Sequence, residues 1–337
     1  MSAYDKAVKA IRAPLPGAPE LRDFVRFATL APNSHNTQPW KFRLQSDTVD
    51  ILPDFSRRTP VVDPDDHHLY VTLGCAAENL LIAARASGRP AELAVMHDRD
   101  AGTWARIVLG RGARSDVDLC EAIPARQSTR CKYDGRALAA DELRQLADAA
   151  ALPGVDVLFV TGRDRLEQAL GFIQAGNGAQ MDDPAFVNEL KDWLRYNPAA
   201  ALEHGDGLLG KCSGSPSAPD WLGPLVFDLA FRKAAENRKY ARQLRSSAGL
   251  AVFVTERVDP EGWIEVGRSF ERFALRATAL GIRHAHLNMP IEVPETRPGF
   301  AHWLGIPGRR PDLVIRFGKA RPMPMSIRRP LDAVIVP

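Results

Sequence analysis

The sequence predicts an α+β protein with two related halves, each a small, mainly antiparallel sheet packed by helices. Two observations support this prediction. Segments with helical spacing of apolar residues alternate with short strand-like runs, and two pairs of these runs, both in the first half, are interpreted as a hairpin and a strand pair. Two long apolar helices, one in each half, also share small and acidic residues at matching places. The halves would then form a pseudo-dimer within one chain.

Length and composition set the broad class. The 337 residues are 45% hydrophobic and 25% charged, as in ordinary globular proteins that bury a substantial core. A net charge of +3 is too small to indicate nucleic-acid binding. The first residues lack the apolar stretch of a secretory signal, no run approaches the roughly 18 apolar residues of a membrane span, and the cysteines are scattered. We therefore expect a cytoplasmic protein with reduced thiols and no membrane or nucleic-acid partner.

The first half contains three predicted helices, at 4–11, 20–30 and 67–87, and strand-like runs at 41–44, 48–52, 92–96 and 104–109. Asp63, followed by Pro64, is the predicted N-cap of the long third helix. A polar segment at 31–42, with proline near both ends, is a poor helix and a poor strand. We interpret it as a fixed loop whose polar groups face something other than bulk water.

The second half begins with a polar loop at 123–135. Its predicted helices are 141–151, 163–176, 184–196, 226–244, 261–280 and 300–304, and its predicted strands are 155–161, 250–255 and 312–317. Residues 198–222 are rich in Gly, Pro and Ser and show no clear period. A stretch this long without structure is usually functional or disordered.

The internal repeat sets the predicted domain boundaries. The two long helices match at glycine and glutamate positions: Gly74, Glu78 and Gly88 in the first, and Gly267, Glu271 and Gly281 in the second. We predict a first half at 1–120 and a second half at 121–337, although two buried helices could share small residues by chance. An insertion at 197–247 has no counterpart in the first half. We interpret it as a lid, with a peripheral helix closing the core as the alternative.

An arginine, a serine and a second arginine occupy alternate positions in the segment Arg126, Gln127, Ser128, Thr129, Arg130. In an extended segment the two arginines and the serine would share one side, which suits a phosphate or another planar anion. The alternative is a solvated loop with surface ion pairs. Residues 326–330 form a second anion-binding candidate, or an ordinary basic tail.

These motifs, taken together, resemble those of the flavin-dependent nitroreductases. Residues 31–42 resemble the Ala-Pro-x-Ser-x-Asn-x-Gln-Pro-Trp-x-Phe loop of that family, and residues 126–130 resemble its Arg-x-Ser-x-Lys/Arg flavin loop. Residues 288–292 resemble its flavin N5 loop, and 304–318 and 328–330 resemble its later motifs. The resemblance covers most of the chain except about 180–247. Here the Gln-Pro-Trp loop precedes the Arg/Ser loop, which fits a fused dimer with one surviving site, as in the Acg-like branch.

The resemblance implies one noncovalent FMN between the two halves. It assigns the phosphate to Arg126 and to Arg328 or Arg329. Ser128 would bind the ribityl chain or the phosphate, and Arg130 would lie by flavin N1 and the C2 carbonyl. A cation there would stabilise the anionic reduced flavin.

The remaining implied contacts come from the other loops. Asn33, Ser34 and Asn36 would bind the ribityl chain or the ring edge, and the backbone at Ile291 and Glu292 would address flavin N5 and O4. NAD(P)H would deliver hydride, and two electrons would pass to a small electrophilic acceptor, so no side chain needs to act as acid or base. The alternative is an FMN storage or sequestering protein with a lid and little turnover. A fused pair need not dimerise, so we expect a monomer.

Several other residues are given structural roles. Trp40 is predicted to anchor its loop in the core and Gln38 to form a structural loop bond. Neighbouring helical residues point about 100° apart, so His67 and His68 are a poor chelate and we expect no metal there. The pair at 284 and 286 lacks an evident third ligand, and the basic helix at 232–245 is interpreted as a solvated face.

Overall fold

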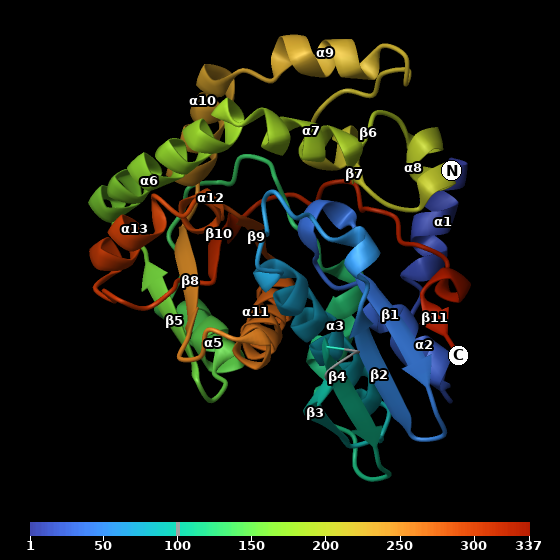
Figure 1. Cartoon of the computed structure of the whole chain (residues 1–337). Coiled ribbons are helices and arrows are strands. Elements are labelled where there is room, and N and C mark those ends of the chain that lie inside the picture. Colours follow the sequence, from blue (N-terminus) through green and yellow to red (C-terminus); the bar gives the residue numbers. More distant parts are fainter. Residues whose placement is uncertain (99–101) are drawn as a thin grey trace.

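The structure is a computed structural model that describes residues 1–98 and 102–337. Two long helices, α3 (His67–Ala86) and α11 (Pro260–Ala279), pack side by side in the middle of the molecule, and one sheet lies on each side of the pair (Figure 1). Of the twenty residues of α3, all but Arg85 are buried, as its nearly continuous apolar sequence indicates. The protein is therefore an α+β fold, as predicted.

Both sheets are mainly antiparallel, as predicted. The first has the order β11-β1-β2-β4-β3, and its only parallel pair among the described strands is β1 with β11. The second has the order β5-β8-β10-β9 and is antiparallel throughout. The strands of the first sheet are β1 (Trp40–Leu44), β2 (Thr48–Pro53), β3 (Ala91–Asp98), β4 (Gly102–Leu109) and β11 (Ile335–Val336). Those of the second are β5 (Val155–Val160), β8 (Gly249–Thr255), β9 (Ile282–His286) and β10 (Leu313–Lys319).

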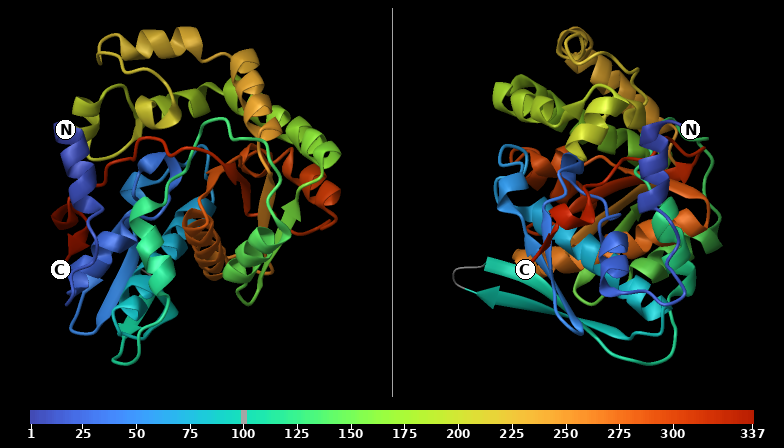
Figure 2. Two further views of the ribbon diagram at one scale, coloured as in Figure 1. Left: turned by 180° about the vertical axis from the view of Figure 1, so that it is seen from behind. Right: turned by 90° about the vertical axis from the view of Figure 1, so that its right-hand side faces the viewer.

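The other helices surround this centre. They are α1 (Ala3–Ile11), α2 (Leu21–Ala28), α4 (Val117–Ala122), α5 (Ala140–Ala150), α6 (Arg163–Asp182), α7 (Pro184–Asp192), α8 (Pro198–His204), α9 (Gly223–Ala230), α10 (Lys233–Arg245), α12 (Met289–Glu292) and α13 (Arg297–Leu304). Figure 2 shows α7 to α10 as a layer over one end of the two sheets, with α9 outermost. No described helix is long and apolar enough to cross a membrane.

The contact between α3 and α11 is reciprocal. A Cβ atom placed on Gly74 would lie 2.0 Å from the carbonyl oxygen of Ile264, and one placed on Gly267 would lie 2.0 Å from that of Val71. Each glycine thus meets the residue three positions before the other glycine. Such self-matching contacts are typical of a two-fold interface. The predicted pair of related halves stays a prediction. The division at residue 120 stays a prediction, and β11, from the end of the chain, lies in the first sheet.

Two predictions about the insertion were wrong. The predicted helix at 226–244 is two helices, because Phe231 and Arg232 leave the helical region of φ and ψ while the ring of Phe231 stacks on that of Phe227, with centroids 4.5 Å apart. The predicted irregular stretch also contains α8, which Asn197 caps with a side-chain oxygen and Pro198 begins. A short parallel pair, β6 (Leu194–Arg195) with β7 (Leu208–Leu209), encloses α8.

Candidate functional site

One cavity brings together the opening loop, the basic loop and the C-terminal segment. Its empty volume is about 500 Å³, with the open mouth included. Six of the ten residues that the sequence nominates line it: Asn33, Asn36, Arg126, Ser128, Arg130 and Arg328. They come from both predicted halves, as a site at the interface between the two copies requires.

The opening loop is held in an unusual backbone conformation by its own amide side chains. His35, Asn36 and Gln38 have φ values of 48°, 55° and 56°, in the left-handed region that ordinary side chains rarely adopt. The Asn33 side-chain oxygen accepts from the Gln38 amide at 2.9 Å, and Gln38 Nε2 donates to the Gly205 carbonyl at 2.9 Å. The predicted structural role of Gln38 is therefore confirmed.

Residues at both ends of this loop connect it to the rest of the fold. Asn36 Nδ2 donates to the carbonyl oxygens of Gly207 and Ile327 at 3.1 and 3.3 Å. Trp40 is fully buried in the main core, as predicted for a loop anchor. The asparagines on the cavity wall already have protein partners, so their role in this structure is to shape the wall.

The basic loop runs in an extended form beside β9. The Thr129 amide donates to the His284 carbonyl at 2.8 Å, and Ser128 pairs with His284 in an isolated bridge. Alternation along this strand-like segment places Arg126, Ser128 and Arg130 on the cavity, as the sequence predicts. Within the described residues, no hydrogen bond or ion pair is formed by the side chain of Ser128 or of Arg130.

Arg126 is buried but keeps a donor for a ligand. Its Nη2 donates to the Leu30 carbonyl at 2.7 Å, and its Nε lies 3.2 Å from the Glu271 carboxylate, which α11 supplies. Its Nη1 has no hydrogen-bond partner among the described residues. Burial raises the pKa of Glu271 to about 7, although the charge of Arg126 opposes this rise.

Arg328 is used differently. Its Nε donates to the Thr29 carbonyl at 2.5 Å, its Nη1 to Asn36 Oδ1 at 2.9 Å and its Nη2 to the Ala31 carbonyl at 3.1 Å. Further bonds reach Leu30 and its own neighbour Ile327. Since protein acceptors engage every guanidinium nitrogen, Arg328 connects the C-terminal segment to the opening loop.

Four nominated residues do not line the cavity. Arg329 donates from its backbone to Gln38 Oε1 at 2.8 Å, and Ser34 lines a smaller neighbouring cavity. The amides of Ile291 and Glu292 both donate to the Asn288 carbonyl, at 2.8 and 3.0 Å, within α12. The predicted flavin contacts of these residues stay predictions.

Sequence reasoning missed four residues on the cavity wall, one of which is Pro324, just before the C-terminal motif. Arg12 follows the last residue of α1, and no spacing pattern marks it as a ligand residue. Leu208 and Cys212 come from the insertion and so place part of the predicted lid on the cavity. Contacts across more than 170 residues of chain have no local signal in the sequence.

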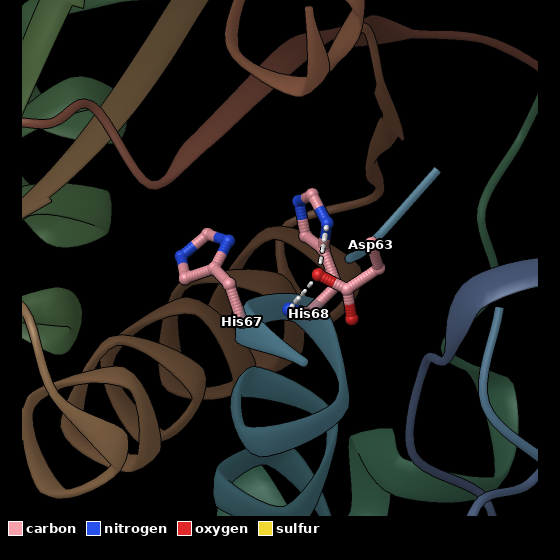
Figure 3. A group of neighbouring side chains, drawn as sticks. All are labelled: Asp63, His67 and His68. Carbon is pink, nitrogen blue, oxygen red and sulfur yellow. Dashed lines mark hydrogen bonds and ion pairs between the residues drawn. The ribbon is translucent and has the colours of Figure 1, made fainter. Parts of the chain in front are cut away.

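Figure 3 shows Asp63, His67 and His68 together at the start of α3. Asp63 accepts from the amides of His68 and Leu69 at 2.9 and 3.0 Å, although Asp66, and not Asp63 as predicted, is the N-cap residue. Asp63 thus satisfies two free amides of the first turn from outside the helix.

The tautomer of His68 argues against a metal at this cluster. Its Nε2 lies 3.2 Å from Asn288 Nδ2, while Asn288 Oδ1 accepts from the Val314 amide, which fixes the orientation of the asparagine. Nε2 therefore accepts, and the proton of neutral His68 lies on Nδ1, which faces Asp63 at 3.6 Å. His68 therefore turns no lone pair toward Asp63, whereas His67 Nδ1 is buried and has no hydrogen-bond partner among the described residues. The expectation that no metal binds here stays a prediction.

Comparison with known proteins identifies the relatives of this chain. No protein-family model matches. Two curated proteins of Mycobacterium tuberculosis, from strains CDC 1551 and H37Rv and both provisionally named NAD(P)H nitroreductases, are each 26% identical to it, over 98% of this chain and 95% of theirs. This chain is therefore similar to these two proteins over nearly the whole of their aligned lengths. Its resemblance to that family, first drawn from scattered motifs, thus extends along the sequence.

Solved structures of nitroreductases also align with this chain. One from Anabaena variabilis aligns over 94% of this chain and 91% of its own, with 10% identity and a TM-score of 0.49. An FMN-dependent nitroreductase of Mycobacterium smegmatis, solved in complex with NADPH, aligns over 60% of this chain and 87% of its own, with 14% identity and a TM-score of 0.41.

Proposed function

We propose that this protein is an FMN-binding, nitroreductase-like oxidoreductase that uses NAD(P)H to reduce a small electrophilic acceptor. The observation that carries the proposal is the meeting of the Arg126-to-Arg130 loop with the opening loop in one cavity. The names of the full-length relatives support the same activity. When bound, the flavin supplies the redox chemistry, taking two electrons from NAD(P)H and giving them to the acceptor.

The donors that remain free in the cavity fit a phosphorylated flavin. Arg126 Nη1 and the side chains of Ser128 and Arg130 have no hydrogen-bond partner among the described residues. Guanidinium groups and a hydroxyl are the donors that suit phosphate oxygens. Arg130 holds a fixed positive charge in a buried place, where it stabilises an adjacent anionic group more strongly than it would in water.

The insertion is proposed to cover this site and to limit the access of water. Asp206 is buried and pairs with Arg57 and Arg195, and its neighbours Leu208 and Cys212 line the cavity. A tightly closed cover would also suit the alternative function, FMN storage with little turnover. The enzyme is preferred because the relatives are named for a reaction.

The flavin assignment is tested by replacing Arg126 and Ser128 together with alanine. This double variant should purify colourless, or lose bound FMN at concentrations at which the parent stays yellow, because two phosphate donors are removed. The matched control is Arg136→Ala, since Arg136 lies just beyond the same loop and is 86% exposed at its side chain. A double variant as yellow as the parent would contradict the assignment.

The two functions are separated by rapid mixing of the flavin-loaded protein with NADPH and, in parallel, with NADH. Fast bleaching of the flavin absorbance supports the oxidoreductase. Reduction by dithionite, together with no bleaching by either nicotinamide, supports storage instead.

A further inference from the structure

A fourth arginine reaches the cavity from the first helix of the chain. Arg12 is the C-cap residue of α1, and its Nη1 donates to the Pro124 carbonyl at 2.7 Å. Its Nε is buried and has no hydrogen-bond partner in the described parts of the chain. Arg12 therefore lines the cavity from the first half, beside the start of the basic loop, and keeps one donor without a protein partner.

The wall of the cavity carries much more positive than negative charge. Arg12, Arg126, Arg130 and Arg328 line it, and its lining residues within 1–98 and 102–337 include no Asp or Glu. Glu271, which does not line the cavity, lies 3.2 Å from Arg126 Nε and offsets part of its positive charge. Cations in a buried place are costly unless anions pair with them, so this wall favours a ligand with more than one negative charge.

The four arginines differ in how many of their guanidinium donors lack a protein acceptor. All the donor nitrogens of Arg328 are engaged by protein oxygens, whereas Arg12 Nε, Arg126 Nη1 and the Arg130 side chain are not. Breaking the bonds of Arg328 would release the opening loop. A phosphate therefore has a better partner in Arg12 than in Arg328.

We infer that Arg12 binds the phosphate of the flavin together with Arg126, and that Arg328 acts as the residue that positions the opening loop. This inference rests on the proposed function and changes its assignment, because the resemblance gives the second phosphate contact to Arg328 or Arg329. The site then includes the end of α1 together with the opening loop, the basic loop and the C-terminal segment. Burial and the charge of Arg126 lower the pKa of Arg12 to about 10, so Arg12 remains a cation at neutral pH.

The position of α1 is set by the same wall. The Tyr4 hydroxyl donates to the Met325 carbonyl at 2.8 Å and lies 3.8 Å from Cys212 Sγ. The helix thus extends from the C-terminal segment at its start to Pro124, close to the basic loop, at its end. These contacts fix the position of α1 without involving the charge of Arg12. A substitution that keeps the length of the Arg12 side chain but removes its charge therefore tests whether that charge binds the phosphate.

The test compares FMN with riboflavin, which lacks the phosphate, by titrating the flavin-free protein and following flavin fluorescence. Arg12→Met should weaken FMN binding about 10- to 100-fold and leave riboflavin binding within about twofold, since one charge-assisted contact is lost. Arg12→Lys should bind FMN with intermediate affinity. The control Arg22→Met, at an exposed arginine paired with Asp332, should change neither affinity.

Equal weakening of FMN and riboflavin in Arg12→Met would overturn the inference, because it would indicate a structural role. Unchanged FMN affinity would overturn it as well, while the proposed function would stand. Failure of the parent protein to bind either flavin would instead refute the proposed function. If Arg12→Met does not fold, the comparison is made between Arg12→Gln and Arg12→Lys. The glutamine variant is then expected to lose affinity for FMN but not for riboflavin. An equal loss of affinity for both flavins would contradict the inference.

Discussion

At the scale of single residues, burial and partners decide what an arginine does. Arg126 and Arg328 both face the cavity, and both belong to motifs that suit an anion. Only Arg126 keeps a free donor, because Arg328 meets the carbonyls of Thr29 and Ala31 and the amide oxygen of Asn36. A motif therefore nominates a charged side chain, but its surroundings decide whether that charge is available.

Glu271 should make the stability of the protein depend on pH. Its pKa is raised from the ordinary 4.5 to about 7 by burial. A carboxyl group whose pKa is raised by folding binds more protons in the folded state. It stabilises that state below about pH 4.5 and loses this contribution as the pH rises through 7.

We expect Glu271→Gln to remove this contribution. Urea unfolding of the parent between pH 5 and 8 should show a decline in unfolding free energy that the variant lacks, with a difference of up to about 1.4 kcal/mol per pH unit. Asp312, whose pKa burial also raises to about 7, contributes in the same direction to both proteins and cancels in the comparison. Parallel pH profiles for the two proteins would rule out Glu271 as a source of the dependence.

At the scale of elements, the central helix pair depends on two glycines. The sequence places these glycines at matching positions of the two helices, and the structure shows that each meets a backbone carbonyl of the other helix. Backbone cannot give way as a flexible side chain can, so a methyl group at either position must push the helices apart.

Gly74→Ala and Gly267→Ala should each lower the free energy of unfolding by at least about 2 kcal/mol. Both should act similarly because their surroundings are reciprocal. Gly171→Ala in α6 is the matched control, since nothing lies within 4 Å of its added methyl group. The control should raise stability by about 0.5–1 kcal/mol, the helical advantage of alanine over glycine. Chemical unfolding of the three variants measures this, and a mild effect at one central glycine would argue against the reciprocal contact.

The error of predicting one helix at 226–244 has a tertiary cause. The break at Phe231 and Arg232 carries neither Gly nor Pro, so apolar spacing continues through it and predicts one helix. The chain turns there because the ring of Phe231 stacks on that of Phe227 while α10 packs along α6. These tertiary contacts override the local helical preference at Phe231 and Arg232.

At the scale of the whole molecule, hydrogen bonds and ion pairs connect the insertion to the first half of the chain, including the opening loop. Gln38 and Asn36 donate to the carbonyls of Gly205 and Gly207, and between these glycines Asp206 pairs with Arg57 and Arg195. This connection fastens one end of the proposed lid to the first half of the chain.

Asp206→Asn should weaken the connection between the insertion and the first half, because it leaves Arg57 and Arg195 without their carboxylate partner. We expect FMN to dissociate roughly ten times faster and residues 194–222 to become more sensitive to proteases. Asp228→Asn on the outlying α9, where the carboxylate meets Lys191 at 2.5 Å, is the control and should change neither property. Unchanged release of FMN from Asp206→Asn would mean that the insertion does not retain the ligand.

The sequence by itself predicted most helices and strands, the likeness of the two long helices and the identity of the two loops, because local spacing of apolar, small and basic residues controls these features. It also nominated Arg126, Ser128 and Arg130 through simple alternation. Only the tertiary structure decided that Arg12 lines the same cavity and that protein oxygens accept from every guanidinium nitrogen of Arg328. Those outcomes depend on carbonyls and side chains distant in the chain, and hydrogen bonds formed only after folding leave no periodic signal in the sequence.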